Sequence, residues 1–196
     1  MAATRNKGKL RELRRLFTDA PVTIRGLEEF PEIEDVRETG TTYEENACLK
    51  ASRYASVTGL AALADDSGLE VNALGGRPGV YSARYAGTAS SYETRIRRLL
   101  GEISSAGSTD RTARFVCVMA LARPDAAIAT TALGICAGVI GSAPRGDAGF
   151  GYDPIFIPDG FDATFAELGE DVKRRISHRA RAAEIIIARL PVFVGN

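Results

Sequence analysis

The chain has 196 residues, which is enough for one sizeable hydrophobic core or two small lobes. Hydrophobic residues make up 45% of it and charged residues 26%, an ordinary composition for a globular protein. Lys and Arg together number 25, and so do Asp and Glu. With no basic excess, the composition does not indicate a nucleic-acid-binding protein.

The cysteines and the single histidine argue against a structural zinc site. Cys48, Cys117 and Cys136 lie far apart and form no Cys-x-x-Cys pair, and the only histidine is His178. Unpatterned cysteines are typical of a reducing compartment, so we expect a cytoplasmic protein. Basic residues at positions 5, 7 and 9 interrupt the start of the chain, so we expect no signal peptide.

The first third of the chain predicts two helices. A strand stub at residues 1–3 leads into a polar loop, and the helix after it carries apolar residues of 10–17 on one face. Thr42 and Glu45 then form a capping box, which opens a second helix that Gly59 ends.

Two acidic residues follow the second helix and a predicted strand. The helix places Asn46 and Lys50 one turn apart on the same side. The apolar run 60–64 predicts a strand that stops at Asp65 and Asp66, where a Ser-Gly turn begins. Adjacent carboxylates repel each other unless a cation or a proton relieves them, and a divalent metal carrying a phosphate is a natural partner. A solvated turn is the alternative interpretation.

The second half of the chain predicts one helix and several strands in succession. Ser91 can cap a helix with apolar residues over 96–103, and the continuous apolar run 115–122 predicts a central strand. Two further strands are expected within 128–140, separated at Gly134. This uncharged region is rich in Ala, Gly and Thr and poor in Leu and Phe, so we interpret it as buried strands and not as a membrane span.

A short strand at 155–157 and a last helix that begins near Ser177 complete the chain. Strands and helices alternate early, while strands follow one another in the middle. This pattern predicts an α/β protein with a mixed sheet.

A polar loop before the first helix is the first candidate binding site. A helix N-terminus offers N–H groups and a partial positive charge to a phosphate, and nearby lysines add cationic contacts. A plain helix start with surface lysines is the alternative, because no Walker motif is present. The loop consists of Thr4, Arg5, Asn6, Lys7, Gly8 and Lys9.

Three more segments carry candidate site residues. Glu38 precedes the capped helix and could share a metal with Asp66. Glycines beside aromatic rings and a carboxylate could let a base stack closely on the segment Phe150, Gly151, Tyr152 and Asp153, and a turn whose aromatic residues pack into the core is the alternative.

Lys173 with His178 and Arg179 is the last candidate set. His178 and Arg179 fall in a first helical turn, where cations conflict with the helix dipole unless an anion is bound. A structural role for the single histidine is the alternative.

In combination, these motifs resemble the inosine triphosphate pyrophosphatase family, the non-canonical purine NTP pyrophosphatases. The resemblance runs from about Thr4 to Leu190. It rests on the segments Thr4-Arg5-Asn6-x-x-Lys9, Glu38-Thr39-Gly40, Glu45-Asn46-Ala47 with Lys50-Ala51, Asp65-Asp66-Ser67-Gly68-Leu69, Leu74-Gly75-Gly76-x-Pro78-Gly79, Ser82-Ala83-Arg84, Pro144-x-Gly146, Phe150-Gly151-Tyr152-Asp153-Pro154 and Ser177-His178-Arg179.

The resemblance implies a Mg²⁺-dependent enzyme that hydrolyses ITP, dITP and XTP to the monophosphate and pyrophosphate. It implies a homodimer with an elongated mixed central sheet flanked by helices, and one domain over 1–196 made of two lobes with an active-site cleft between them. No nucleic acid or membrane partner is expected.

The same resemblance implies roles for individual residues. Glu38 and Asp66 look like metal ligands, with Asp66 also the proton acceptor. The loop 4–9 looks like the triphosphate site. Further substrate contacts are implied for Ser67, Phe150, Gly151, Tyr152, Asp153, Lys173, His178 and Arg179.

Two departures from the family pattern stand out: only Met1–Ala3 precede the phosphate loop, and Cys136 replaces a larger aromatic residue. Two alternative functions stay open. One is a Maf-like pyrophosphatase for modified pyrimidine nucleotides, and the other is a nucleotide sensor without turnover.

Overall fold

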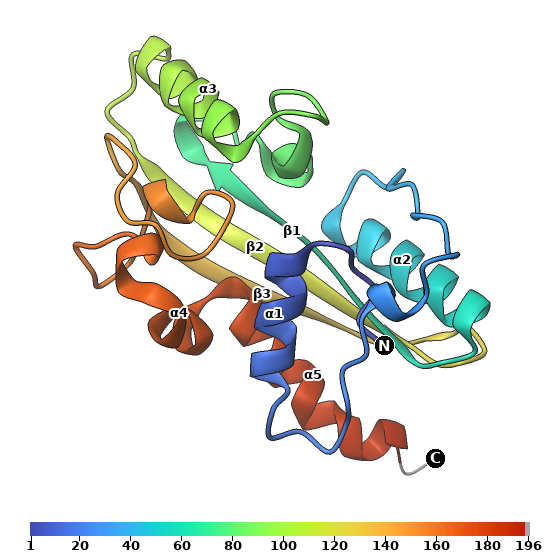
Figure 1. The fold of residues 1–196 in the computed structure, drawn as a ribbon. Coiled ribbons are helices and arrows are strands. Elements are labelled where there is room, and N and C mark those ends of the chain that lie inside the picture. The colour runs from blue at the N-terminus through green and yellow to red at the C-terminus, as the bar shows by residue number, and fades with distance from the viewer. Residues whose placement is uncertain (195–196) are drawn as a thin grey trace. The chain divides into compact units, whose positions relative to one another are not determined.

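A computed structural model describes residues 1–194, and it has a mixed α/β fold (Figure 1). One sheet contains four strands in the order β1 (Ala62–Val71), β2 (Thr112–Ala122), β3 (Ile128–Ile140) and β4 (Phe156–Pro158). β4 pairs antiparallel to β3, whereas Ala2 forms an isolated parallel bridge with Leu63. Parallel and antiparallel pairings therefore coexist, and the predicted α/β class with a mixed sheet is confirmed.

The described residues form the helices α1 (Lys7–Leu16), α2 (Tyr43–Thr58), α3 (Tyr92–Ser105), α4 (Phe165–Ile176) and α5 (His178–Val194). Short 3-10 turns are η1 (Leu27–Glu29), η2 (Asn72–Leu74), η3 (Gly79–Arg84) and η4 (Asp153–Ile155). No helix within 1–194 is long and apolar enough to cross a membrane.

Local capping signals predicted α2 and α3 correctly. The Thr42 hydroxyl accepts a hydrogen bond from the Glu45 amide, and Gly59 ends α2 in the left-handed region at φ 65°. Ser91 caps α3 through the amide of Thr94. These ends are set by short-range hydrogen bonds, which is why the sequence alone could place them.

Two predicted strand boundaries are wrong. β1 does not stop before Asp65 but continues through Ser67 to Val71, so both aspartates lie inside the strand. β3 likewise runs without a break through Gly134. Glycine is needed there for another reason: a methyl group at this position would lie 2.0 Å from the main-chain oxygen of His178 in α5.

The C-terminal region contains one helix that the sequence analysis did not predict as a separate element. α4 begins after Thr164, whose hydroxyl accepts from the Glu167 amide while the Glu167 side chain accepts from the Thr164 amide. This capping box was visible in the sequence. The last helix, predicted to begin near Ser177, is α5 and begins at His178.

The chain divides into two compact units. Unit 1 contains residues 1–66, 117–134 and the chain from 178 onward; unit 2 contains residues 67–116 and 135–177. The predicted single domain over 1–196, with a cleft between two lobes, stays a prediction.

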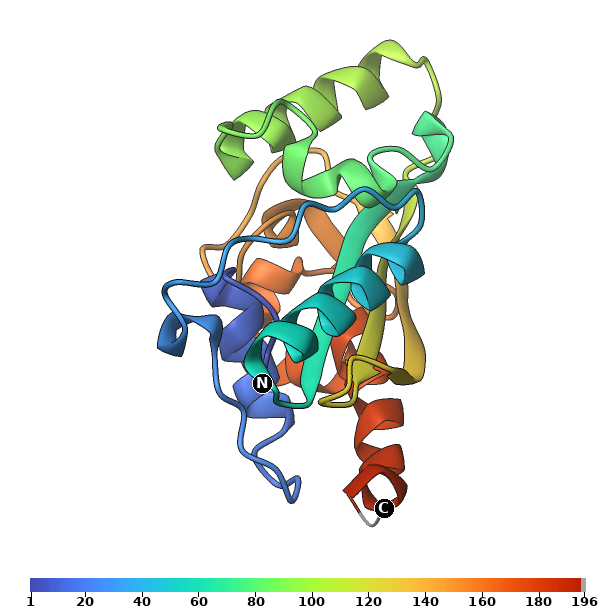
Figure 2. The same cartoon turned by 90° about the vertical axis from the view of Figure 1, so that its right-hand side faces the viewer.

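Unit 1 has a core on each face of its part of the sheet. The helix α2 lies on one face, and α1 and α5 lie on the other (Figures 1 and 2). α2 packs alanines against one face, where Ala62 and Ala64 of β1 are buried. α1 and α5 pack larger side chains against the other face, where Leu63 is buried. Consecutive residues of β1 therefore point alternately to α2 and to the α1–α5 side, as the two-residue period of a strand requires.

Unit 2 has a single core in which aromatic rings cluster. The ring centroids of Phe115 and Phe156 are 4.6 Å apart, and those of Phe156 and Phe165 are 5.4 Å apart. Cys136 is buried in this core, where the resemblance indicated a larger residue.

Candidate active site

Asp65 and Asp66 face opposite sides of β1. Asp65 contacts Lys9 of α1 and Arg179 of α5, whereas Asp66 contacts Asn46 and Lys50 of α2. Because side chains alternate along a strand, two adjacent acids do not form one site. The repulsion expected between them is relieved separately on each face by cations.

Asp66 lies in a buried polar cluster on the α2 side. Its Oδ2 accepts a hydrogen bond of 3.0 Å from the Asn46 amide, and the Lys50 ammonium lies 3.7 Å from its Oδ1. Lys50 also contacts the Glu38 carboxylate at 2.5 Å and donates to the main-chain oxygen of Asp65 at 2.8 Å. Lys50 therefore connects the two carboxylates that were predicted to hold the metal.

Burial and neighbouring charge perturb both partners. Burial, the larger effect, and the charge of Glu38 raise the pKa of Asp66, while Lys50 and Lys9 oppose that rise. For Lys50, burial alone would lower the pKa, but the charges of Asp66, Glu38 and Asp65 raise it overall. Lys50 is therefore a cation held by three acidic neighbours.

Asp65 lies in a second cluster on the α1–α5 side. Its Oδ2 accepts from Arg179 Nη2 at 2.9 Å and from Nε at 3.3 Å, and it lies 3.0 Å from the Lys9 ammonium. Arg179 also donates to Glu12 of α1 at 2.5 Å. Arg179 and Asp65 are 1% and 2% exposed, so this ion pair is fully enclosed.

These contacts fix the charge states. Burial alone would raise the pKa of Asp65, but Lys9, Arg179 and Lys50 hold it well below its usual range. Burial would likewise lower the pKa of Arg179, and Asp65 with Glu12 raises it instead. Both groups are therefore charged throughout the physiological range.

The predicted phosphate loop lies in unit 1 before α1. The Asn6 side-chain oxygen caps the helix by accepting from the amides of Gly8 at 2.9 Å and Lys9 at 3.1 Å. Arg5 pairs with Asp35. Two first-turn amides are thus already occupied, and Lys9 reaches Asp65 of β1.

The donor set around Asp66 fits Mg²⁺ bound together with a polyphosphate. Mg²⁺ is usually held in such sites by one or two carboxylates, with phosphates and waters completing the shell. Glu38 and Asp66 supply two carboxylates that interact with each other and already bracket the Lys50 cation. Within 1–194 there is no group of three or more His, Cys, Asp or Glu that could hold a metal without a substrate.

Charge balance supports the same fit. The two clusters together contain one more carboxylate than cation, and their members are Lys9, Lys50, Arg179, Glu12, Glu38, Asp65 and Asp66. A divalent cation would make the net charge of the two clusters positive, which favours the binding of an anionic ligand.

Unit 2 contains the remaining predicted site residues, Ser67, Phe150, Gly151, Tyr152, Asp153 and Lys173. The Lys173 ammonium contacts the Asp153 carboxylate at 2.5 Å and lies 4.6 Å from the centre of the Phe150 ring. Asp153 also accepts from the Phe150 amide at 2.8 Å. Gly149 has φ 79°, and a methyl group there would lie 2.1 Å from the Asp153 carboxylate. The Lys173–Asp153 pair therefore holds the 149–153 loop in one conformation.

Tyr152 was predicted to offer a ring face to a base, but the structure places it in the core of unit 2. It is 3% exposed, its hydroxyl donates to the main-chain oxygen of Ser82 at 3.0 Å, and its ring meets Tyr92 edge-on at 5.7 Å. Phe150, the other aromatic residue of this loop, is half-buried. Ser67, also in unit 2, is half-buried.

Within each unit, the structure brings together residues that are far apart in sequence. Asp66 and Glu38 share a cluster in unit 1, and Arg179 lies in the neighbouring one. His178 is buried at the start of α5. Asn46 and Lys50 were noted for their helical spacing but not predicted as site residues, and Glu12 had no sequence signal at all.

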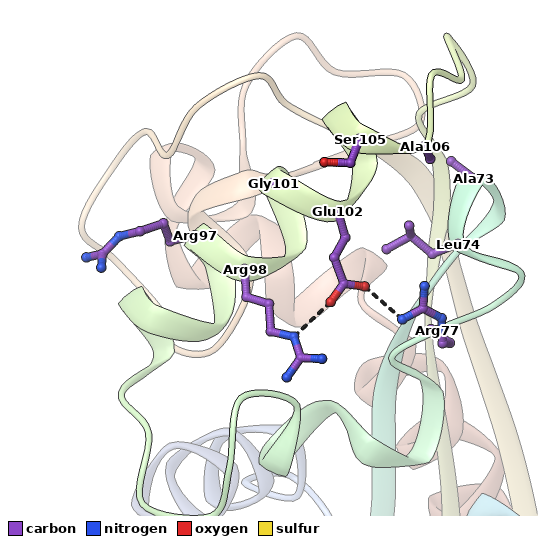
Figure 3. Close-up of a pocket in the computed structure, with 9 residues that line it drawn as sticks. All are labelled: Ala73, Leu74, Arg77, Arg97, Arg98, Gly101, Glu102, Ser105 and Ala106. Atoms are coloured by element: carbon purple, nitrogen blue, oxygen red, sulfur yellow. Dashed lines mark hydrogen bonds and ion pairs between the residues drawn. The ribbon is translucent and has the colours of Figure 1, made fainter.

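A separate hollow of about 680 Å³ lies in unit 2 beside α3 (Figure 3). Its lining includes Leu74, Arg77, Arg98 and Glu102, and Glu102 contacts Arg77 at 2.7 Å and Arg98 at 2.8 Å. None of the predicted site residues lines it.

Known proteins resemble this chain over nearly its whole length. A family model described as the Ham1 family matches residues 1–189. A dITP/XTP pyrophosphatase of Geobacter sulfurreducens is 50% identical over 186 residues, covering 95% of this chain and 93% of the relative. A dITP/XTP pyrophosphatase of Nostoc is 47% identical over 198 residues, covering 100% and 96%.

Solved structures agree with this assignment. A HAM1 protein from Coxiella burnetii superimposes with a TM-score of 0.88 at 42% identity, covering 97% of this chain and 96% of that one. The Staphylococcus aureus Ham1 protein gives a TM-score of 0.84, also at 42% identity and with the same coverage. On sequence and on fold, the chain belongs to the Ham1 family.

Proposed function

We propose that this protein hydrolyses dITP, XTP and ITP to the nucleoside monophosphate and pyrophosphate, and so removes deaminated purines from the nucleotide pool. The observation that carries the proposal is the cluster of the buried Asp66, Asn46 and Lys50 with the half-buried Glu38, in a chain half identical to a dITP/XTP pyrophosphatase. The cluster supplies the acids and cations that this reaction needs, and the relatives indicate the substrate class.

The proposed reaction is a single displacement. The oxygen of a water molecule attacks the α-phosphorus, the bond from that phosphorus to the bridging oxygen breaks, and pyrophosphate leaves. Asp66 accepts the proton of the attacking water. Lys9 and Lys50 neutralise charge on the phosphates as it builds up.

Glu38 and Asp66 are the residues that would hold Mg²⁺. When bound, the ion would neutralise and polarise the phosphate oxygens. Mg²⁺ dependence is tested by removing metal with EDTA and restoring it, with turnover expected only after Mg²⁺ is added. A binding measurement gives a second readout: Mg²⁺ should raise the melting temperature of the wild-type protein more than that of Glu38→Gln.

Base selection requires donors directed at the 6-oxygen of the purine. The Nε, Nη1 and Nη2 groups of Arg179 already donate to Asp65 and Glu12. We therefore assign base selection first to His178, with Phe150 as the stacking surface. A site built on hydrogen bonds to a substrate group rejects an analogue that cannot make them.

The decisive assay measures pyrophosphate released in the presence of Mg²⁺ from dITP, XTP, ITP, GTP, ATP and a modified pyrimidine triphosphate, each tested separately. We expect the first three to react at least about a hundredfold faster than ATP. Comparable rates with ATP, or orthophosphate as the first product, would refute the proposal. Turnover of the pyrimidine alone would favour the Maf-like alternative, and binding without turnover would favour the sensor.

Asp66→Asn should nearly abolish turnover, since the amide cannot accept the proton, while circular dichroism and melting temperature stay close to wild type. The matched control is Asp171→Asn, the same change at an exposed position of α4. An active Asp66→Asn enzyme would mean that another residue is the acceptor.

We also propose that the protein is a cytoplasmic homodimer, as the resemblance implies. Light scattering coupled to size-exclusion chromatography tests the dimer, for which a mass near twice 20.9 kDa is expected.

A further inference from the structure

We propose that Asp65 is a positioning residue that fixes Lys9 and Arg179 on one face of β1 and Lys50 on the other. Its carboxylate holds Lys9 of α1 and Arg179 of α5, and its main-chain oxygen holds Lys50 of α2. The assignment of a nucleoside triphosphate as the ligand of Lys9 and Lys50 rests on the proposed function. The contacts themselves do not depend on it.

The first support is geometric. Lys9 Nζ at 3.0 Å and Arg179 Nη2 at 2.9 Å approach the same oxygen, Oδ2, and Arg179 Nε lies 3.3 Å from it. α1 and α5 carry these two cations from opposite ends of the chain. One carboxylate oxygen in β1 therefore determines where both charges lie.

The second support is what each cation would do without Asp65. Lysine has a long, flexible side chain, and the Lys9 side chain is 15% exposed, so without an anchor its ammonium could adopt many positions. Arg179 cannot leave, because it is buried, and would lose one of its two acidic contacts described above while keeping the one with Glu12. Loss of the Asp65 charge would therefore free Lys9 to move and would remove one of the negative charges that neutralise the buried Arg179.

Direct participation of Asp65 in the chemical step fits the structure poorly. Its side chain is 1% exposed, and Oδ2 already accepts from two cationic groups. A proton acceptor must come within hydrogen-bonding distance of the attacking water. Asp66, on the other face of β1, is the acid next to Glu38 and Lys50.

Asp65→Asn is a well-matched probe. The amide oxygen can take the place of Oδ2 and keep two hydrogen bonds while the negative charge is lost. Oδ1 is buried without a hydrogen-bond partner among residues 1–194, so an NH₂ group there displaces no donor. The main-chain oxygen that holds Lys50 is unchanged by the substitution.

The test combines steady-state kinetics on dITP with a double-mutant cycle. We expect Asp65→Asn to raise KM about ten- to a hundredfold while kcat changes less than about threefold, because Lys9 is displaced and the proton acceptor is not. In a Lys9→Met background, Asp65→Asn should raise KM by less than about twofold further, since the cation it positions is already absent.

Two results would overturn the proposal. A loss of kcat in Asp65→Asn as large as that in Asp66→Asn would place Asp65 in the chemical step. Independent, multiplicative effects of Asp65→Asn and Lys9→Met on KM would show that Asp65 does not act through Lys9. If Asp65→Asn does not fold, the double variant Asp65→Asn/Arg179→Gln removes both charges of the buried ion pair together. Its KM and kcat are then measured with and without Lys9→Met, as for the single variant.

A calorimetric titration with inorganic pyrophosphate and Mg²⁺ separates this proposal from the proposed function. Wild-type protein that fails to hydrolyse dITP refutes the function. The role of Asp65 is still supported if pyrophosphate binds about tenfold or more weakly to Asp65→Asn, with little further change when Lys9→Met is added. Equal affinities in wild type and Asp65→Asn, or no binding by wild type, would overturn the proposal.

Discussion

Gly134→Ala tests how α5 is placed against β3. The position lies in the middle of β3, within unit 1, where the first turn of α5 crosses the strand. The added methyl carbon would lie 2.0 Å from the main-chain oxygen of His178 and 2.5 Å from the amide nitrogen of Ala182. Both atoms belong to the backbone, so no side-chain rotation can relieve the overlap, and the helix or the strand has to move by about 1 Å or more.

The cost follows from this geometry. Overpacking a well-packed site usually destabilises a protein by about 1–3 kcal/mol. Because α5 would have to shift as a unit, we expect about 3 kcal/mol. For a chain of this size, that corresponds to a fall in melting temperature of about 6–12 °C. The shift also displaces His178 and Arg179, so kcat/KM for dITP should fall at least about tenfold.

Urea denaturation and differential scanning calorimetry measure the loss, and Gly101→Ala is the matched control. Gly101 is exposed within α3, and a methyl group there meets no atom within 4 Å. Replacing a helical glycine with alanine should stabilise by up to about 1 kcal/mol. A Gly134→Ala protein that melts within 2 °C of wild type, where about 6–12 °C is expected, would show that α5 does not press on β3 there.

Three further predictions concern other buried or paired groups. Lys173→Met should lower the free energy of unfolding, measured in urea, by about 3–5 kcal/mol, because the buried Asp153 carboxylate loses its ion pair with Lys173. The double variant Lys173→Met/Asp153→Asn should lose less stability, because it removes the carboxylate as well. Burial raises the pKa of Cys117 to about 12, so at pH 8 only about one such thiol in ten thousand is ionised. A thiol reagent should therefore label the half-buried Cys48 well before it labels Cys117. Hydrogen bonds from Tyr85 and Arg98 lower the pKa of Glu102 from 4.5 to about 2. The stability that these bonds add is present above pH 4.5 and is lost as the pH falls toward 2. Between these two pH values, the free energy of unfolding of Glu102→Gln in urea should therefore fall less steeply than that of the wild-type protein.

Features set by neighbouring residues could be predicted from the sequence, and features set by distant ones could not. The ends of α2 at Thr42 and Gly59 follow from hydrogen bonds made within one turn. The Ser-Gly pair after Asp66 indicated a turn, but pairing with β2 extends β1 through it. Gly134 indicated a break, yet its role is to let α5 approach, and nothing near it in sequence reveals that contact.

In the candidate site too, local contacts could be predicted from the sequence and long-range contacts could not. Helical spacing placed Asn46 and Lys50 on one side of α2, which is correct, but only the sheet reveals that Asp66 is the acid they meet. Glu12 contacts Arg179, a residue at the opposite end of the chain, so its role could not be anticipated. Local sequence patterns thus predicted many of the site residues, but their contact partners are determined by long-range packing.

The strand geometry of β1 gives the two adjacent aspartates different functions. On a turn, both carboxylates could have met one cation. In a strand with a helical layer on each face, the two-residue period sends Asp65 toward α1 and α5 and Asp66 toward α2. Each acid therefore meets a different set of cations: Asp65 positions Lys9 and Arg179 through its carboxylate and contacts Lys50 through its main-chain oxygen. The continuation of β1 past Ala64 is thus what separates a positioning acid from a reactive one, and the different kinetic effects expected of Asp65→Asn and Asp66→Asn follow directly from that single structural feature.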